Sequence, residues 1–173
     1  VGANKYGYSE FSFDLSPYVK TGKNRIDVEV DNSLVPNCRW YSGSGIYRPV
    51  WLRISKPGAV KSLKVKTLSY SPAIIQVETD VDARIRIVYD GKTVAEGKTG
   101  VYEIPNAKLW SDRTPSLYTC IAEAGGERLE VRFGIRKLQW SAKTGLMVNG
   151  QEILLRGGCI HHDNGILGAC SFP

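Results

Sequence analysis

The sequence predicts an all-β protein built around an immunoglobulin-like β-sandwich. Short segments in which apolar and polar residues alternate recur along the 173 residues. Turn residues interrupt them every 8–12 positions or so, which is typical of such sandwiches. No segment of useful length has the period of an amphipathic helix. Eighteen glycines and eight prolines suit a chain of short strands and many turns.

The first part of the chain contains strand-like segments around one long loop. Residues 10–15 and 25–30 alternate cleanly, and residues 50–54 form a further strand-like segment. An aromatic and glycine-rich loop occupies residues 32–47. Because Pro and Gly interrupt regular structure, Pro57-Gly58 is the best candidate for a domain boundary.

A second series of strands follows this boundary. In one of them Ile85, Ile87 and Tyr89 are expected on one face, with Arg84 and Arg86 on the other. Asp-Gly and Gly-Gly between such segments indicate hairpins. The predicted strands are residues 62–68, 74–79, 84–89, 117–123 and 129–133, with turns at Asp90-Gly91 and Gly125-Gly126.

The pattern changes near Leu138. Residues 146–155 read as a hairpin with Asn149-Gly150 at its turn. Its second arm ends in residues 153–155, which are apolar without alternation, so both faces should be buried. Such a strand suits a parallel sheet or barrel better than a sandwich, and a new domain is expected here.

Charge and cysteine usage narrow the function classes. The net charge is +6, but the 23 Lys and Arg are scattered among strand-like segments, so nucleic-acid binding is not expected. No apolar run approaches the roughly 20 residues of a membrane span, and no membrane partner is expected. The cysteines lack C-x-x-C spacing, so they are predicted to be free and mostly buried, with no structural zinc. They are Cys38, Cys120, Cys159 and Cys170.

Four stretches in a fixed order carry a family resemblance. They are residues 6–15 with 30–33; residues 40–52; residues 109–111 and 115–118 with 133–137; and residues 148–151 with 155–163. Together they resemble the β-galactosidase/β-glucuronidase superfamily, glycoside hydrolase family 2. One stretch alone is a weak signal, whereas the ordered set is specific and covers essentially the whole chain.

The resemblance implies three domains. Residues 1–56 look like the C-terminal part of a jelly-roll, sugar-binding-type domain, and residues 57–137 look like a complete immunoglobulin-like sandwich. Residues 138–173 look like the start of a (β/α)8 TIM barrel, truncated after its first strand. The expected fold is therefore all-β, with the sandwich flanked by a partial jelly roll and a barrel strand.

The family's chemistry is expected to lie outside this chain. A retaining glycosidase uses two carboxyl groups about 5–5.5 Å apart, one as acid and one as nucleophile. In the family both are glutamates on later barrel strands, so this chain is expected to hold no catalytic residue and to be inactive by itself. Its own glutamates in alternating segments are expected to face solvent; they are Glu10, Glu29, Glu78, Glu123 and Glu130. No cofactor or metal is assigned.

Sugar contacts are expected where the resemblance places the mouth of the first barrel strand. Residues 156–161 match the family's Arg-Gly-x-Asn-x-His, and His161 is the best candidate for binding substrate, followed by His162 and Asp163. An imidazole suits sugar hydroxyls because it can both donate and accept hydrogen bonds. Cys159 replaces the usual Asn. A loop histidine without a ligand and a His-His-Asp metal site stay open as alternatives.

The loop at residues 37–45 supplies two further candidates, Arg39 and Trp40. Trp rings stack on the apolar faces of sugars. In relatives this loop reaches toward the barrel mouth, and galactosidases tend to have an acidic residue where Arg39 stands, so an acidic or otherwise different glycon stays open. The alternative is that Trp40 and Tyr41 pack in a domain interface. Trp51 and Trp110 are interpreted as core or interface residues.

The resulting hypothesis is a scaffold piece of a retaining, β-galactosidase-like exo-glycosidase of carbohydrate metabolism. Its partner is a carbohydrate bound by the complete enzyme, and self-association through exposed edges is anticipated. The alternative is a stand-alone carbohydrate-binding or structural sandwich module. Residues 155–168 argue against this alternative because they resemble the start of a barrel. For the parent protein a periplasmic or secreted location is suspected, and a cytoplasmic one stays open.

Overall fold

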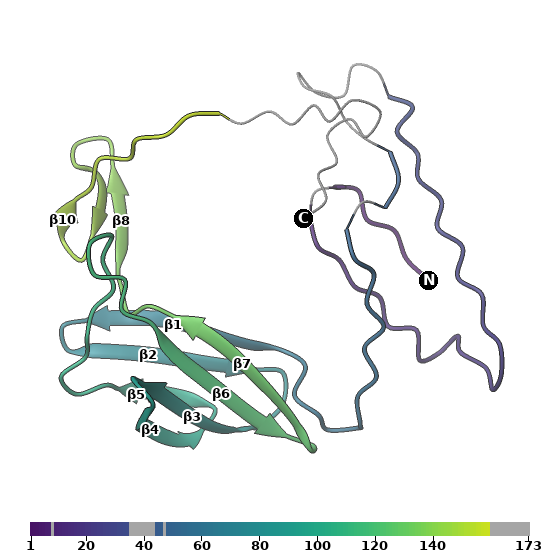
Figure 1. The fold of residues 1–173 in the computed structure, drawn as a ribbon, viewed down its shortest axis with the longest axis horizontal. Coiled ribbons are helices and arrows are strands. Elements are labelled where there is room, and N and C mark those ends of the chain that lie inside the picture. The colour runs from purple at the N-terminus through teal and green to yellow at the C-terminus, as the bar shows by residue number, and fades with distance from the viewer. Residues whose placement is uncertain (8, 35–43, 47, 160–173) are drawn as a thin grey trace. The chain divides into compact units, whose positions relative to one another are not determined.

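The computed structural model describes residues 1–7, 9–34, 44–46 and 48–159, and every regular element in these ranges is a β-strand (Figure 1). The described chain divides into two units, residues 1–49 with the C-terminal residues from 159 onward, and residues 50–158. All of the strands lie in the second unit. They are β1 (Leu63–Tyr70), β2 (Ala73–Thr79), β3 (Arg84–Tyr89), β4 (Lys92–Lys98), β5 (Gly100–Glu103), β6 (Tyr118–Ala124), β7 (Glu127–Phe133), β8 (Leu138–Ser141), β9 (Gly145–Val148) and β10 (Gln151–Glu152).

Strands β1 to β7 form a sandwich of two antiparallel sheets, in the orders β1-β2-β5 and β4-β3-β6-β7 (Figure 1). Three strands facing four, with crossed connections, is an immunoglobulin-like arrangement. The prediction of an all-β sandwich is therefore confirmed. The five strands predicted in this region correspond to β1, β2, β3, β6 and β7, with ends that differ by a few residues.

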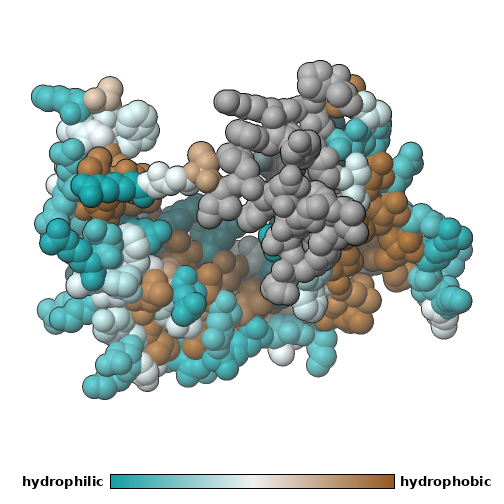
Figure 2. All heavy atoms as spheres, turned by 45° about the horizontal axis from the view of Figure 1, so that its top comes forward, coloured by the Kyte–Doolittle hydropathy of each residue, from teal (hydrophilic) through white to brown (hydrophobic). Residues whose placement is uncertain are grey.

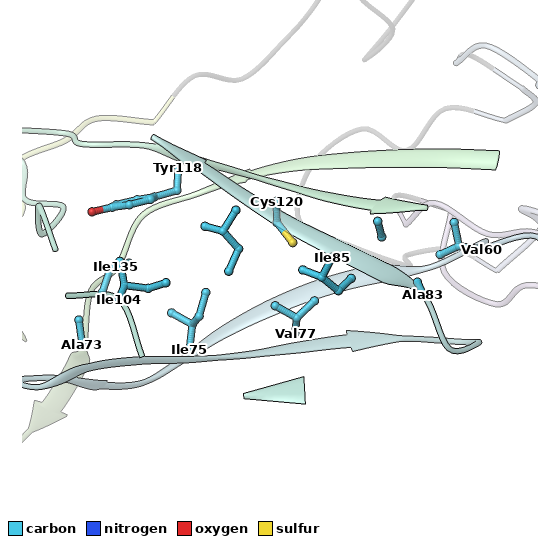
Figure 3. Close-up of a cluster of buried hydrophobic side chains, with 12 residues drawn as sticks. Val60, Ala73, Ile75, Val77, Ala83, Ile85, Ile104, Tyr118, Cys120 and Ile135 are labelled. Atoms are coloured by element: carbon cyan, nitrogen blue, oxygen red, sulfur yellow. The ribbon is translucent and has the colours of Figure 1, made fainter. Parts of the chain in front are cut away.

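Alternation along the strands produces the core between the two sheets (Figure 3). In β3, Ile85 and Ile87 are fully buried whereas Arg84 and Arg86 face outward, as predicted. Since side chains in a strand alternate between faces, each central strand contributes every second residue to the core. The buried cluster consists of Val60, Ala73, Ile75, Val77, Ala83, Ile85, Ile87, Ile104, Tyr118, Cys120, Ala122 and Ile135.

All three predicted two-residue turns are present, and both residues of each have positive φ. Asp90 and Gly91 join β3 to β4, and Gly125 and Gly126 join β6 to β7. Asn149 (φ 51°) and Gly150 (φ 78°) join β9 to β10. Positive φ at both central positions is the hairpin geometry that matches strand twist, which explains the Asp, Asn and Gly at these sites.

Four predicted strand segments have no strand assignment: residues 10–15, 25–30, 50–54 and 153–155. A strand is stable only when a neighbour takes up its backbone hydrogen bonds, and sequence alternation does not supply that neighbour. Apolar side chains of these segments are exposed: Ile26 is 66% exposed and Leu154 75%. Apolar residues, coloured brown in Figure 2, reach the surface of the described part of the chain. The jelly-roll and barrel assignments, and the boundaries at residues 56 and 137, stay predictions.

The segment before the sandwich is attached to it by Arg53. The guanidinium of Arg53 donates hydrogen bonds to the carbonyl oxygens of Lys61 (3.0 Å) and Val60 (3.1 Å). These bonds explain why residues 50–56 belong to the same unit as the sandwich. Trp51, interpreted as a core or interface residue, is 86% exposed and therefore lies outside the sandwich core.

Candidate functional site

The five predicted sugar-contact residues lie outside the described residues. They are Arg39, Trp40, His161, His162 and Asp163. The structure does describe the residues that flank them. The loop with Arg39 and Trp40 is flanked by Leu34 and Ser44, and the segment with His161 is preceded by Cys159. Ser44 and Cys159 fall in the same unit of the chain. The contacts of these flanking residues define the surroundings of the predicted site.

Hydrogen bonds close the base of the aromatic loop. The side-chain amide of Asn32 donates to the hydroxyl oxygen of Ser44, across 3.2 Å. The backbone N–H of Ser33 donates to Asp31 Oδ1 at 2.9 Å. The Ser33 hydroxyl and then its backbone N–H lower the pKa of Asp31, because both stabilise the carboxylate. One hydrogen bond, between Asn32 and Ser44, therefore joins the two flanks of the loop, and the carboxylate of Asp31 lies just before the first flank.

The second flank is the chain that follows β10. The N–H of Ile153 donates to the carbonyl of Leu146 (2.9 Å), which extends the hairpin by one bond. Beyond it Leu154 and Leu155 are 75% and 74% exposed. Their burial on both faces was expected for a barrel strand, and within the described residues that burial does not occur. A strand of this kind needs sheet neighbours on both sides.

The glutamates of the sandwich occupy its solvated faces, as predicted. Glu78 pairs with Lys66 at 2.7 Å, and Glu130 pairs with Arg128. Glu123 lies opposite Arg84 on one neighbouring strand and opposite Arg128 on the other. Glycoside hydrolysis requires an acid kept protonated by burial near an ionised partner. These cation-flanked carboxylates, of which Glu130 is exposed and Glu78 and Glu123 are partly exposed, are suited to ion pairing on the sheet surface instead.

A hollow of about 330 Å³ lies where β1, β7 and the start of β8 meet. Its polar groups are the guanidiniums of Arg132 and Arg136 and the hydroxyl of Thr67; its lining contains no carboxylate. A second hollow, of about 420 Å³, lies at the β6–β7 turn beside Glu123 and Glu127. Neither combines an enclosed apolar wall with a convergent carboxyl pair, the arrangement that glycoside chemistry requires.

Metal-ligand clusters and membrane-spanning helices are both absent from the described residues. Within them, no three His, Cys, Asp or Glu side chains are grouped as metal ligands. Across the same ranges, no helix long and apolar enough to cross a bilayer is present. Cys120 is free and buried, and burial raises its pKa to about 11; Cys159 is free and exposed. The buried thiol is thus a packing residue rather than a nucleophile.

Trp110 and Asn149 have structural roles that the sequence interpretation only partly anticipated. Trp110 packs as expected, with its ring 4.2 Å from the guanidinium carbon of Arg136. Asn149 was recognised as a turn residue, but its side chain also bonds to the backbone of Lys137 and Trp110. An Asn-Gly pair signals a turn without indicating the partners of the amide group, so the sequence contained no sign of these contacts.

Comparison with known proteins identifies similar chains. A β-galactosidase from Bacteroides ovatus is 33% identical over 98% of this chain. A putative β-glucuronidase from Formosa agariphila is 30% identical over 97% of it. The chain spans 24% and 19%, respectively, of the lengths of these two relatives. It therefore corresponds to about a fifth to a quarter of each.

Solved structures agree with the sandwich. A β-glycosidase from Bacteroides vulgatus superposes with a TM-score of 0.69 at 27% identity, covering 92% of this chain and 24% of its own. A glycosyl hydrolase family 2 member from Bacteroides cellulosilyticus superposes with a TM-score of 0.64 at 31% identity, covering 83% and 24%. Residues 53–136, which include all seven strands of the sandwich, match the glycosyl hydrolases family 2. This chain belongs to glycoside hydrolase family 2, the family of the β-galactosidases and β-glucuronidases.

Proposed function

We propose that this chain is a non-catalytic scaffold part of a retaining exo-glycosidase that cleaves O-glycosidic bonds in carbohydrate metabolism. The observation that carries the proposal is the match to relatives named β-galactosidase and β-glucuronidase over 97–98% of this chain. The described glutamates support the non-catalytic part. They lie in sheet faces beside Lys and Arg, not as a pair across an apolar cleft.

In this proposal the chain contributes one edge of the sugar pocket. His161 binds a sugar hydroxyl, His162 and Asp163 assist it, and Arg39 and Trp40 approach from the loop whose base is closed by the Asn32–Ser44 bond. The presence of Ser44 and Cys159 in one unit supports this grouping, since each directly flanks one of the two segments. The domain scheme at residues 1–56, 57–137 and 138–173 is part of the same proposal.

The first experiment measures hydrolysis by the purified 173-residue chain. Nitrophenyl β-galactoside and β-glucuronide should show no turnover above buffer, because the acid and the nucleophile are supplied by other parts of the enzyme. Sequencing the gene downstream should reveal an Asn-Glu pair and a later second glutamate. Turnover that survives mutation of every glutamate in the chain would contradict the proposal. A stop codon directly after Pro173 would favour a stand-alone binding or structural module.

The second experiment concerns His161 in the complete enzyme. His161→Ala should lower kcat/KM on the order of 10²-fold, since a hydrogen bond to the substrate that strengthens in the transition state is lost. Thr93→Ala, on the exposed face of β4 in the sandwich, is the matched control and should leave kcat/KM unchanged. Equal kinetics for both variants would remove His161 from the sugar pocket.

A further inference from the structure

The connection between β7 and β8 is held at each of three successive residues. The carbonyl of Ile135, a fully buried residue, accepts a hydrogen bond from the N–H of Trp110 (3.0 Å). The N–H of Arg136 donates to the Thr67 hydroxyl on β1 (3.4 Å). The N–H of Lys137 donates to Asn149 Oδ1 (2.9 Å). These hydrogen bonds therefore restrict the backbone of residues 135–137, where the chain passes from the sandwich to β8.

Asn149 joins this connection to the hairpin of β8, β9 and β10. Its own N–H donates to the carbonyl of Lys137 at 2.9 Å, so that both backbone groups of Lys137 are bonded to one residue. Its side-chain Nδ2 donates to the carbonyl of Trp110 at 3.0 Å. One asparagine at the hairpin turn thus makes three hydrogen bonds to the end of the sandwich.

Trp110 is in turn fixed by its neighbours. Its ring stacks on Arg136, and its side chain occupies the space above Gly134, where an added Cβ would lie 2.6 Å from Trp110 Cβ. An isolated bridge pairs Trp110 with Pro115. The partner of the Asn149 amide is thus itself packed in place, so the bond joins the hairpin to a well-fixed point of the sandwich.

We propose that Asn149 is a positioning residue that fixes the direction in which the chain leaves the sandwich through β9 and β10. The functional significance of this inference rests on the proposed function, because the segment after β10 leads in sequence to His161, the residue assigned to the sugar pocket. A site is productive only when the elements that carry it are held in a defined geometry. Asn149 supplies that constraint at the base of the segment.

Residual dipolar couplings of the 173-residue chain test the inference without requiring activity. In the wild type, the amides of β9 and of β3 and β6 should fit one alignment tensor. Asn149→Gly keeps the positive φ but deletes both side-chain bonds, and it should scale down the couplings of β9 by at least about 15%, the fall in the order parameter S between rigid and flexible backbone. Asn106→Gly changes another left-handed asparagine (φ 52°), within the sandwich, and should leave β9 unchanged.

Asn149→Asp provides an independent variant. It retains the acceptor for Lys137 and replaces the donor to the Trp110 carbonyl by an oxygen, so the alignment of β9 should again fall while the turn persists. Amide exchange at Ile153, bonded to Leu146, verifies that the hairpin is folded in each variant. If Asn149→Gly unfolds the hairpin, the couplings of β9 in Asn149→Asp test the positioning role instead.

Unchanged couplings for β9 in a variant with a folded hairpin would overturn the positioning role and restrict Asn149 to turn stability. This result is distinguishable from failure of the proposed function, which depends on the downstream glutamates and on the hydrolysis assays. If Asn149 orients β9 but the complete protein proves not to be a glycosidase, the positioning role stands. Its link to a sugar pocket is then rejected.

Discussion

Tyr118 shows how one polar atom is accommodated in the apolar core. Its side chain is 2% exposed, and its ring lies 4.6 Å from that of Tyr89 and 5.6 Å from that of Phe133, centroid to centroid. Its hydroxyl oxygen accepts a hydrogen bond from the N–H of Lys108 at 2.7 Å. Burial raises the pKa of the Tyr118 hydroxyl, and the Lys108 bond partly offsets this.

Tyr118→Phe should lower the free energy of unfolding by about 1–3 kcal/mol, because the Lys108 N–H loses its partner inside the protein. Urea unfolding followed by tryptophan fluorescence measures the change. Tyr89→Phe is the control: Tyr89 packs against Tyr118 but lies at the strand end and is half-buried, so the loss should be smaller. Equal losses would mean that the bond between the Lys108 N–H and the Tyr118 hydroxyl adds nothing beyond the general effect of removing a tyrosine hydroxyl.

Asp80 makes stability depend on pH. One of its carboxylate oxygens accepts hydrogen bonds from the N–H groups of Lys61 and Ser62, both at 2.9 Å. First the Lys61 bond and then the Ser62 bond lower the pKa of Asp80 below its ordinary 3.8. A carboxyl group whose pKa is lowered by folding stabilises the native state above its unfolded pKa, and this contribution is lost as pH falls through the folded pKa.

The wild type should therefore lose more stability than Asp80→Asn when the pH is lowered from about 5 to below 4. The asparagine oxygen still accepts the two backbone bonds but does not titrate. Urea unfolding at a series of pH values, plotted as the difference between the two proteins, measures this. A difference that stays constant across the range would show that Asp80 titrates alike in both states.

At the scale of elements, the junction between the sandwich and the hairpin is closely packed, because an added Cβ at Gly134 would lie 2.6 Å from Trp110 Cβ. Gly134 follows β7 directly, and Trp110 packs where its side chain would be. Gly134→Ala should destabilise the unit by about 1–3 kcal/mol, as overpacking does when its neighbours cannot move. Gly157→Ala is the matched control because an added Cβ there meets no atom within 4 Å. Equal melting temperatures for the two variants would contradict this account.

For the individual elements, the success of the sequence prediction depended on the length and alternation of each strand and on a recognisable turn beside it. β3 and β9 were anticipated because alternation and an adjacent two-residue turn specify both the strand and its hairpin partner. β4, β5 and β8 were not among the predicted strands: β4 lacks a regular apolar alternation, and β5 and β8 have only four residues each. Short strands without a strong pattern are defined by their partners rather than by their own residues.

At the scale of the whole molecule, residues 50–158 form a unit with its own core, and residues 1–49 belong to the other unit. A fragment of residues 50–158 expressed alone should therefore melt cooperatively, at the melting temperature of the sandwich transition in the full chain. Circular dichroism measures both transitions. A melting temperature more than about 5 °C lower, the equivalent of roughly 1 kcal/mol for a domain of this size, would show that the other unit supports the sandwich.

Exposed apolar side chains lead to a further expectation for the full chain. Trp51, Trp140 and Leu154 are 86%, 76% and 75% exposed. Apolar surface of this kind favours association. Sedimentation velocity should show a weight-average mass that rises with concentration. A strictly monomeric chain at all concentrations would contradict the expectation of self-association.

The sequence by itself determined the all-β class, the two-faced strands and the three hairpin turns, because each follows from interactions between residues close along the chain. It also indicated family membership, through the order of four motifs. Only the tertiary structure decided that Asn149 bonds to Lys137 and Trp110, that Trp110 rests on Gly134, and that Arg53 attaches the preceding segment. These contacts join residues that lie from about eight to about forty positions apart, beyond the reach of local sequence patterns, and their geometry depends on how the chain packs.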